Sequence, residues 1–163
     1  MNGADVEGQG AGVRGQGYQQ LVAWQKAHNL ALDAFRCSET LRARHRWLAD
    51  QLVRSAVSVP ANIAEGYSRG SLREYLHFLN IARGSLGEVE YYLIFSRDAS
   101  LISPADFDKL LSMAREAARL LFGLIKAIQA KAGVTRSASI RDASFAYDSA
   151  DVPLANDSLT LGP

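Results

Sequence analysis

The sequence predicts an all-α protein, an up-down-up-down antiparallel four-helix bundle with flexible N- and C-terminal tails. Three observations support this fold class. Apolar residues recur every three or four positions in four separate segments, short polar links separate the later segments, and no segment alternates apolar and polar residues as a strand would. Because short links join antiparallel neighbours, consecutive helices are expected to run in opposite directions.

Composition and length define the expected boundaries. A chain of 163 residues with 48% hydrophobic content suits one domain with its own core, which we expect over residues 18–132. Residues 1–17 contain six glycines and almost no large apolar side chain, so this segment is expected to be disordered. Residues 133–163 are rich in Ser, Ala and Asp without a helical period, and they are expected to form a flexible tail.

The first two helical patterns form the N-terminal half of the predicted bundle. The expected buried seam of the first is Leu21, Trp24, His28, Ala31 and Phe35, with His28 as a hydrogen-bonded packing residue. The second extends from about residue 46 to 65, and its apolar side is expected to comprise Leu52, Val53, Ala56, Val57, Val59 and Ile63. Pro60 interrupts this pattern, at a cost of about 3 kcal/mol in an ideal helix. Either the helix kinks at Pro60 or two helices meet there, and the unbroken phase of the pattern favours a kink.

Local signals mark the ends of the third and fourth helices. Ser71 and Glu74 have the spacing of a capping box, and Ser103 followed by proline predicts the start of the fourth helix. Gly133 is expected to terminate that helix. The third helix is expected to bury Tyr75, Leu79, Ala82, Leu86, Val89 and Leu93, and the fourth Phe107, Leu110, Ala114, Ala117, Leu121, Leu124, Ile125 and Ile128. The small residues Ala82, Gly84, Ser85 and Gly87 favour close approach of another helix, although they could also be merely tolerated.

A polar stripe is the most informative feature of the second helix. Its residues recur every three or four positions, and the main ones are Gln51, Arg54, Ser58, Asn62 and Glu65. Arg54 lies beside apolar residues within a helix, which suggests partial burial and a carboxylate partner, with Glu65, Glu88 and Glu90 as candidates. We interpret the stripe, with Glu88, as a structural or assembly feature whose directional hydrogen bonds could fix the register between subunits.

The charge distribution identifies one candidate nucleic-acid site. Residues 18–132 contain 15 Lys and Arg against 11 Asp and Glu, a net charge of +4 in a chain whose total is +1. The densest basic cluster is Arg42, Arg44 and Arg46 in the first link, and the planar guanidinium suits phosphate. The alternative is a solvated loop that Glu39 and Asp50 neutralise.

No residue pattern indicates an enzyme, a metal site, a cofactor or a small-molecule substrate. His28, His45 and His77 lack metal-ligand spacing, and neither Ser55 nor Ser58 has a His or Lys nearby at catalytic spacing. Cys37, the only cysteine, is expected to be a buried, inert thiol. No secretory signal or stretch of about 18 apolar residues is present, so we expect no membrane contact and a cytoplasmic location.

Three segments resemble the family of four-helix-bundle proteins encoded in intervening sequences of bacterial 23S rRNA genes. They are LVAWQKAH at residues 21–28, SVPANIAEG at 58–66, and Phe78-Leu79 with Ala82, Gly84-Ser85 and Glu88. The chain departs from the family's pattern at Glu90-Tyr91 and in the basic link at residues 42–46. That family is similar to the accessory variability protein of diversity-generating retroelements, a basic bundle that forms a ring of five and binds nucleic acid. The resemblance therefore implies a homopentamer with an RNA- or nucleoprotein-related role, and it supplies no catalytic residues.

The sequence therefore favours a non-enzymatic oligomeric bundle that binds RNA or a ribonucleoprotein through a basic surface. The alternative function is a protein–protein interaction scaffold without affinity for nucleic acid.

Overall fold

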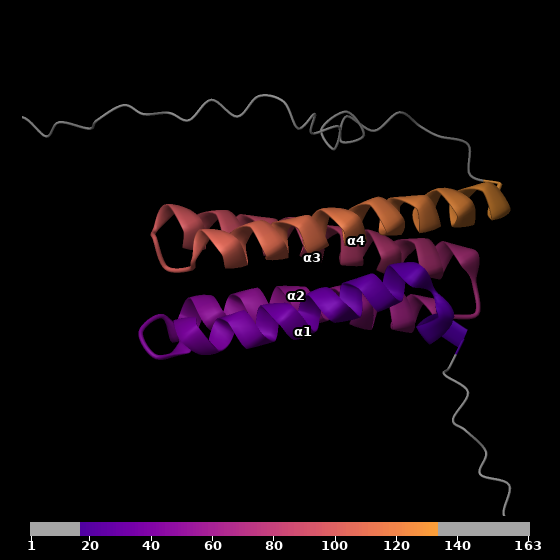
Figure 1. Ribbon diagram of the computed structural model, residues 1–163. Helices are drawn as coiled ribbons and strands as arrows, with labels where there is room; N and C mark the ends of the chain where they lie inside the picture. The colour runs from indigo at the N-terminus through magenta and orange to yellow at the C-terminus, as the bar shows by residue number, and fades with distance from the viewer. Residues whose placement is uncertain (1–16, 134–163) are drawn as a thin grey trace, which may run out of the picture.

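The computed structural model describes residues 17–133, and the prediction of two flexible tails falls almost wholly outside this range. A short 3-10 helix, η1 (Gly17–Gln20), precedes four α-helices. These are α1 (Val22–Arg42), α2 (Arg46–Tyr67), α3 (Leu72–Asp98) and α4 (Pro104–Lys131). Residues 17–133 contain no strand, and successive helices run in opposite directions (Figure 1). The predicted all-α four-helix bundle is confirmed.

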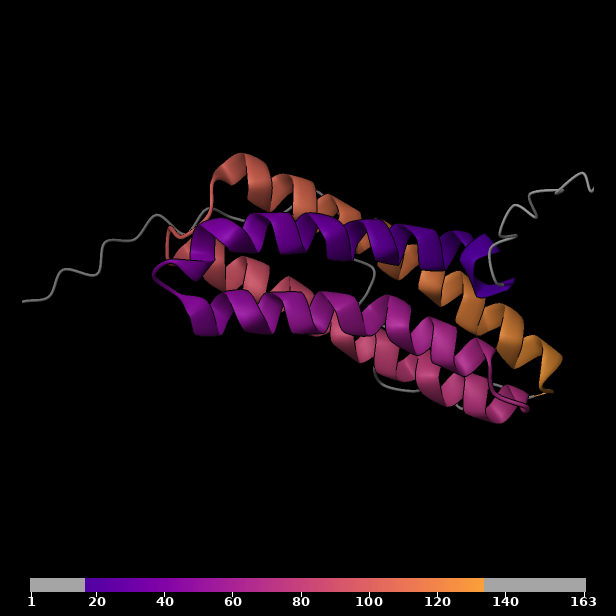
Figure 2. The same ribbon diagram turned by 90° about the horizontal axis from the view of Figure 1, so that it is seen from below.

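Each helix packs against two others, in the order α1, α2, α3, α4 and back to α1. Figure 2 shows α1 and α2 side by side on one face, with α4 inclined behind α1. The core lies along the centre of the bundle, where every helix contributes fully buried residues. The largest of these are Leu30, Leu41, Leu48, Leu52, Ile63, Leu79, Leu93, Leu110 and Leu121.

The expected seam of α1 is only partly correct. Its buried residues are Ala23, Ala27, Leu30, Ala31, Ala34, Ser38 and Leu41. Of the expected seam only Ala31 is buried, whereas Trp24 and His28 are half-buried and Phe35 is 48% exposed. Four of these seven buried residues are alanines, which let α1 approach its neighbours closely, and Trp24, His28 and Phe35 lie at the margin of the core. His28 stacks on Trp24, with 4.8 Å between ring centroids.

One continuous helix, α2, includes Pro60, so the alternative of two helices meeting there is wrong. Pro60 is buried, and its ring takes part in packing although it lacks the N–H that would bond to the carbonyl of Ala56. The buried side of α2 is narrower than the apolar side that the sequence predicted, since Val53 is half-buried and Val57 is exposed.

The predicted helix ends of α3 and α4 agree with the structure. Ser71 accepts a hydrogen bond from the backbone N–H of Glu74 (3.2 Å), and Ser103 accepts one from Asp106 (3.0 Å). Gly133 has a φ of +64°, the left-handed conformation that glycine adopts at low cost beyond a helix end. The expected core residues of both helices are buried except Leu124, which is half-buried.

Two ion pairs join α1 to α4. Lys26 lies 3.0 Å from Glu116, and Lys109 lies 3.0 Å from Asp33. The hydrogen bond from Lys109, together with one from Arg36, holds the pKa of the Asp33 carboxyl below its ordinary value, although partial desolvation opposes this. These pairs fix the lateral position of α1 on α4.

Candidate nucleic-acid interface

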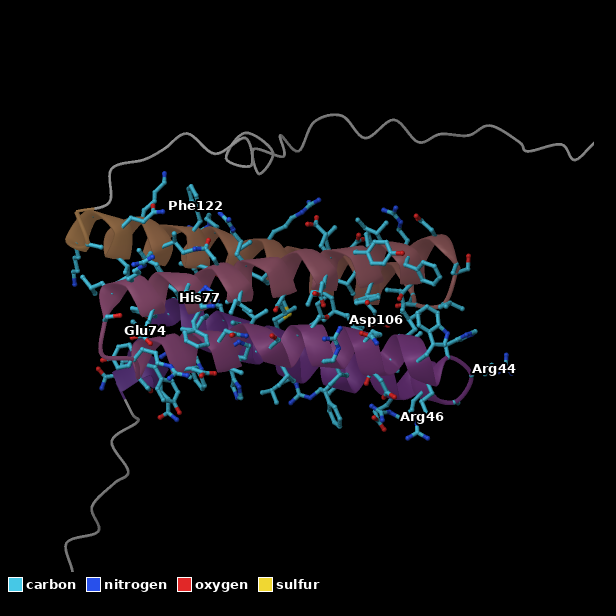
Figure 3. The ribbon with its side chains drawn as sticks, turned by 180° about the vertical axis from the view of Figure 1, so that it is seen from behind. Arg44, Arg46, Glu74, His77, Asp106 and Phe122 are labelled. Atoms are coloured by element: carbon cyan, nitrogen blue, oxygen red, sulfur yellow. The ribbon has the colours of Figure 1, made fainter. Side chains whose placement is uncertain are left out.

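The predicted basic cluster lies at one end of the bundle, around the turn between α1 and α2. Arg42 is the last residue of α1, Arg46 is the first of α2, and Arg44 lies in the turn between them. Backbone hydrogen bonds from Arg44 and His45 to the carbonyl of Leu41 hold the turn (3.2 and 2.8 Å). Figure 3 shows Arg44 at the tip of the turn, with Arg46 pointing away from the helices.

Nearby carboxylates neutralise this cluster only in part. Arg42 lies 3.3 Å from Asp50 and 3.5 Å from Glu39, so the alternative of a neutralised loop describes Arg42 well. The contact of Arg46 with Asp50 is longer, at 3.7 Å, and the Arg46 side chain is 80% exposed. Arg44 pairs with no carboxylate in the part of the chain that the structure describes. The Arg44 guanidinium is therefore unpaired among residues 17–133, and that of Arg46 is held only by one long contact, so both can reach a ligand.

An exposed aromatic cluster lies beside Arg46, and it was not predicted from the sequence. Trp47 on α2 meets Phe95 on α3 edge to face, with 5.7 Å between centroids, and Tyr91 lies 6.4 Å from Phe95. Trp47 and Tyr91 are 57% and 59% exposed, and Phe95 is 36% exposed. Its sequence signal was weak, because only the pairing of the start of α2 with the end of α3 brings these rings together.

The polar stripe runs along the side of α2 that faces α3. Gln51 accepts two hydrogen bonds from Arg54 (2.7 and 3.1 Å), and Glu88 is the carboxylate nearest to this guanidinium, at 3.5 Å. The expected partial burial of Arg54 is wrong, because its side chain is 65% exposed within the protomer. Arg54 projects outward because the apolar residues beside it in the sequence point to other sides of the helix.

The central part of the stripe joins α2 to α3. Asn62 donates to the carbonyl and hydroxyl oxygens of Ser58 (2.7 and 3.0 Å), and Ser85 on α3 donates to the same hydroxyl (2.9 Å). Near the end of α2, Glu65 accepts a hydrogen bond from Arg69, whose guanidinium lies over the ring of Phe78. Much of the stripe's hydrogen-bonding capacity is thus used inside one protomer.

Comparison with known protein families identifies one that matches this chain. The family model described as 23S rRNA-intervening sequence protein matches residues 19–123, which include every candidate residue named above. The chain belongs to this family.

One solved structure has the same fold. It is a protein of unknown function from the S23 ribosomal protein family of Bacteroides thetaiotaomicron, with a TM-score of 0.61 and 25% sequence identity. The match covers 64% of this chain and 99% of that one. No significant match was found among curated proteins.

Metal-ligand clusters and membrane-spanning helices are absent from the described residues. Within residues 17–133, no three His, Cys, Asp or Glu side chains come together as metal ligands, and no helix there is long and apolar enough to cross a membrane. Cys37 is half-buried rather than fully buried, and desolvation raises the pKa of its thiol. A raised pKa keeps the thiol protonated at neutral pH, in keeping with the expected low reactivity.

Proposed function

We propose that this protein is a non-enzymatic, self-assembling bundle that binds RNA or a ribonucleoprotein through the basic turn between α1 and α2. The observation that carries the proposal is that Arg44 and Arg46 are not neutralised by close carboxylate partners. Arg44 has no carboxylate partner among residues 17–133, and Arg46 has only a distant one. The name of the family, which refers to 23S rRNA intervening sequences, supports RNA as the ligand.

The chemistry of the turn suits a phosphate backbone. A guanidinium presents a rigid fork of donors that matches two phosphate oxygens, and each contact releases condensed counterions from the nucleic acid. The turn also projects beyond the helices, where a long polyanion meets no steric barrier (Figure 3). A cytoplasmic location goes with this proposal.

Assembly into a homopentamer is the second part of the proposal, and the resemblance to the accessory variability protein is its main support. The protomer also exposes several large apolar side chains, among them Leu32 and Phe35 on α1 and Val57 on α2. Contact between copies would remove such surface from water. The same residues favour the alternative function, a scaffold that binds other proteins and has no affinity for RNA.

A two-residue substitution tests RNA binding. The variant Arg44→Gln/Arg46→Gln removes both available guanidinium groups and leaves Arg42 with its carboxylates. We expect it to bind single-stranded RNA at least tenfold more weakly at about 0.1 M salt, with a shallower dependence of affinity on salt, because each lost phosphate contact lowers the slope by about 0.7. Fluorescence anisotropy of labelled RNA, titrated at several salt concentrations, measures both quantities.

The matched control is Arg73→Gln/Arg119→Gln, which removes the same charge from exposed positions on α3 and α4. Melting temperatures of both variants should stay close to that of the wild type, because exposed charges contribute little to stability. Equal loss of affinity in both variants would indicate a general effect of charge. No RNA affinity of the wild type at low salt would favour the scaffold.

A further inference from the structure

The exposed cluster of Trp47, Tyr91 and Phe95 has features that packing inside the protomer does not explain. Aromatic side chains are usually buried because each removes a large apolar area from water. Here, at the α1–α2 turn end of the bundle, the rings of Trp47 and Tyr91 each keep more than half of their surface accessible. Phe95 contacts both, so the three side chains form one continuous platform.

Arginines lie along the same edge of the bundle. Arg46 is adjacent to Trp47 in the chain, and Arg54 lies two helical turns beyond Trp47 on the same side of α2. The contact of Arg54 with Glu88, together with that of Trp47 with Phe95, places Tyr91 between the two arginines along the α2–α3 edge. The edge from Trp47 to Arg54 therefore extends over about 10 Å, the length of seven helical residues.

We infer that this platform binds unpaired bases of single-stranded nucleic acid, which stack on Trp47 and Tyr91 while Arg44, Arg46 and Arg54 contact the phosphates. The inference rests on the proposed function and specifies its ligand. Sites that bind single strands usually combine aromatic side chains with cationic ones. The aromatic rings stack on the bases, since every base has a face that can stack, and the cations contact the backbone. At 3.4 Å per nucleotide, the edge from Trp47 to Arg54 has room for about three nucleotides.

A duplex fits this platform poorly. Bases in an A-form helix are paired and stacked on each other, so their faces are not available to Trp47 or Tyr91. Three carboxylates near the platform already form ion pairs. Asp50 pairs with Arg42 and Arg46, Glu88 pairs with Arg54, and Asp98 pairs with Arg97. Arg44, in the adjacent α1–α2 turn, has no carboxylate partner among residues 17–133.

The test compares single-stranded and duplex ligands on the full-length protein. Labelled oligouridylate, oligothymidylate and a duplex RNA of equal length are titrated by fluorescence anisotropy against wild type, Trp47→Ala, Trp47→Phe and Tyr91→Ala. We expect the wild type to prefer either single strand over the duplex. Trp47→Ala and Tyr91→Ala should each bind single strands about tenfold or more weakly, whereas Trp47→Phe, which retains a ring, should lose only a few-fold.

Intrinsic fluorescence supplies a second measurement. Stacking of a base on the Trp47 indole should quench its emission, and Trp47→Phe should lack this quenching although it still binds RNA. The control is Phe122→Ala, which removes a half-buried aromatic ring beside a cation, Lys126, on α4. Figure 3 places Phe122 toward the opposite end of the bundle from Arg44 and Arg46, so this variant should bind like the wild type.

The results separate this inference from the proposed function. If the wild type binds RNA with steep salt dependence and the Trp47 and Tyr91 variants bind equally well, the platform is not the site although RNA binding stands. Tighter binding of duplex than of single strands overturns the inference in the same way. If these variants lose assembly by light scattering and retain RNA affinity per protomer, the cluster is a contact between subunits. Absence of RNA binding by the wild type overturns both proposals.

Discussion

Tyr75 shows how a single buried side chain limits the stability of the bundle. Its ring is buried against Tyr67, with 6.1 Å between centroids, and its hydroxyl has no hydrogen-bond partner among residues 17–133. A buried hydroxyl without a partner loses its bonds to water and gains none in return, at a cost of about 1–3 kcal/mol. Burial, together with Tyr67, also raises the pKa of Tyr75 to about 12.

The variant Tyr75→Phe should therefore be more stable than the wild type by about 1 kcal/mol at neutral pH. Between pH 10 and 12 the unfolded wild type releases the Tyr75 proton while the folded state keeps it, so the wild type loses stability over this window and the variant does not. The advantage of the variant should grow there by up to about 2–3 kcal/mol. Urea denaturation across this pH range measures the difference. Tyr91→Phe, at an exposed position, should not gain stability at neutral pH, and a destabilised Tyr75→Phe would reveal a partner for the hydroxyl.

At the scale of single residues, the sequence did not correctly predict which side chains of α1 and α2 are buried. The spacing of Trp24, His28 and Phe35 resembles a core seam, but the buried residues lie on the adjacent side of α1 and are mainly alanines, together with Leu30 and Leu41. Arg54 was expected to be partly buried because its sequence neighbours are apolar, whereas it projects into solvent. The spacing of apolar residues shows that a segment is helical. Which side of the helix is buried in the core depends on the helices that pack against it.

At the scale of helices, the best-predicted features are those encoded locally. The caps at Ser71 and Ser103 and the terminator Gly133 depend only on residues within one or two turns, and all three agree with the structure. The position of Arg44 in a turn was likewise readable from the sequence. The aromatic platform was not, because it depends on the register between α2 and α3, which no local signal encodes.

The contact between the end of α2 and the start of α3 depends on Gly66. A Cβ atom built at this position would lie 2.8 Å from the Cβ of Phe78 and 2.8 Å from a ring carbon of Tyr75. Both side chains are attached close to the α3 backbone, so α3 itself would have to move. We expect Gly66→Ala to lower the free energy of unfolding by about 1–3 kcal/mol in spite of the higher helix propensity of alanine.

Gly123 on α4 supplies the matched control for this substitution. A Cβ atom there meets nothing within 4 Å, so Gly123→Ala should raise the stability by up to about 1 kcal/mol. Thermal and urea unfolding of both variants measure the two effects. If both alanines stabilise the protein equally, the close approach of α3 to Gly66 does not constrain the fold.

At the scale of the whole molecule, the small residues of α3 separate into two groups. Ala82 and Ser85 are buried, and Ser85 bonds to Ser58 across the contact with α2. Gly84 and Gly87 instead lie on the exposed side, where an added Cβ atom meets nothing within 4 Å. Close packing inside the protomer therefore does not account for these two glycines, each of which costs the helix about 1 kcal/mol relative to alanine.

The proposed ring of five gives these glycines a role, because a neighbouring protomer could approach the α3 backbone closely only where side chains are absent. We therefore expect Gly84→Ala/Gly87→Ala to shift the mass measured by light scattering from five times the 17.7 kDa chain toward one, while Gly123→Ala leaves it unchanged. In a protein that does not assemble through α3, the same double variant should simply be more stable, by up to about 2 kcal/mol, because alanine has the higher helix propensity. A wild type that is monomeric at micromolar concentration would contradict the ring itself. A stabilised, fully assembled double variant would retain the ring and exclude this side of α3 from its interface.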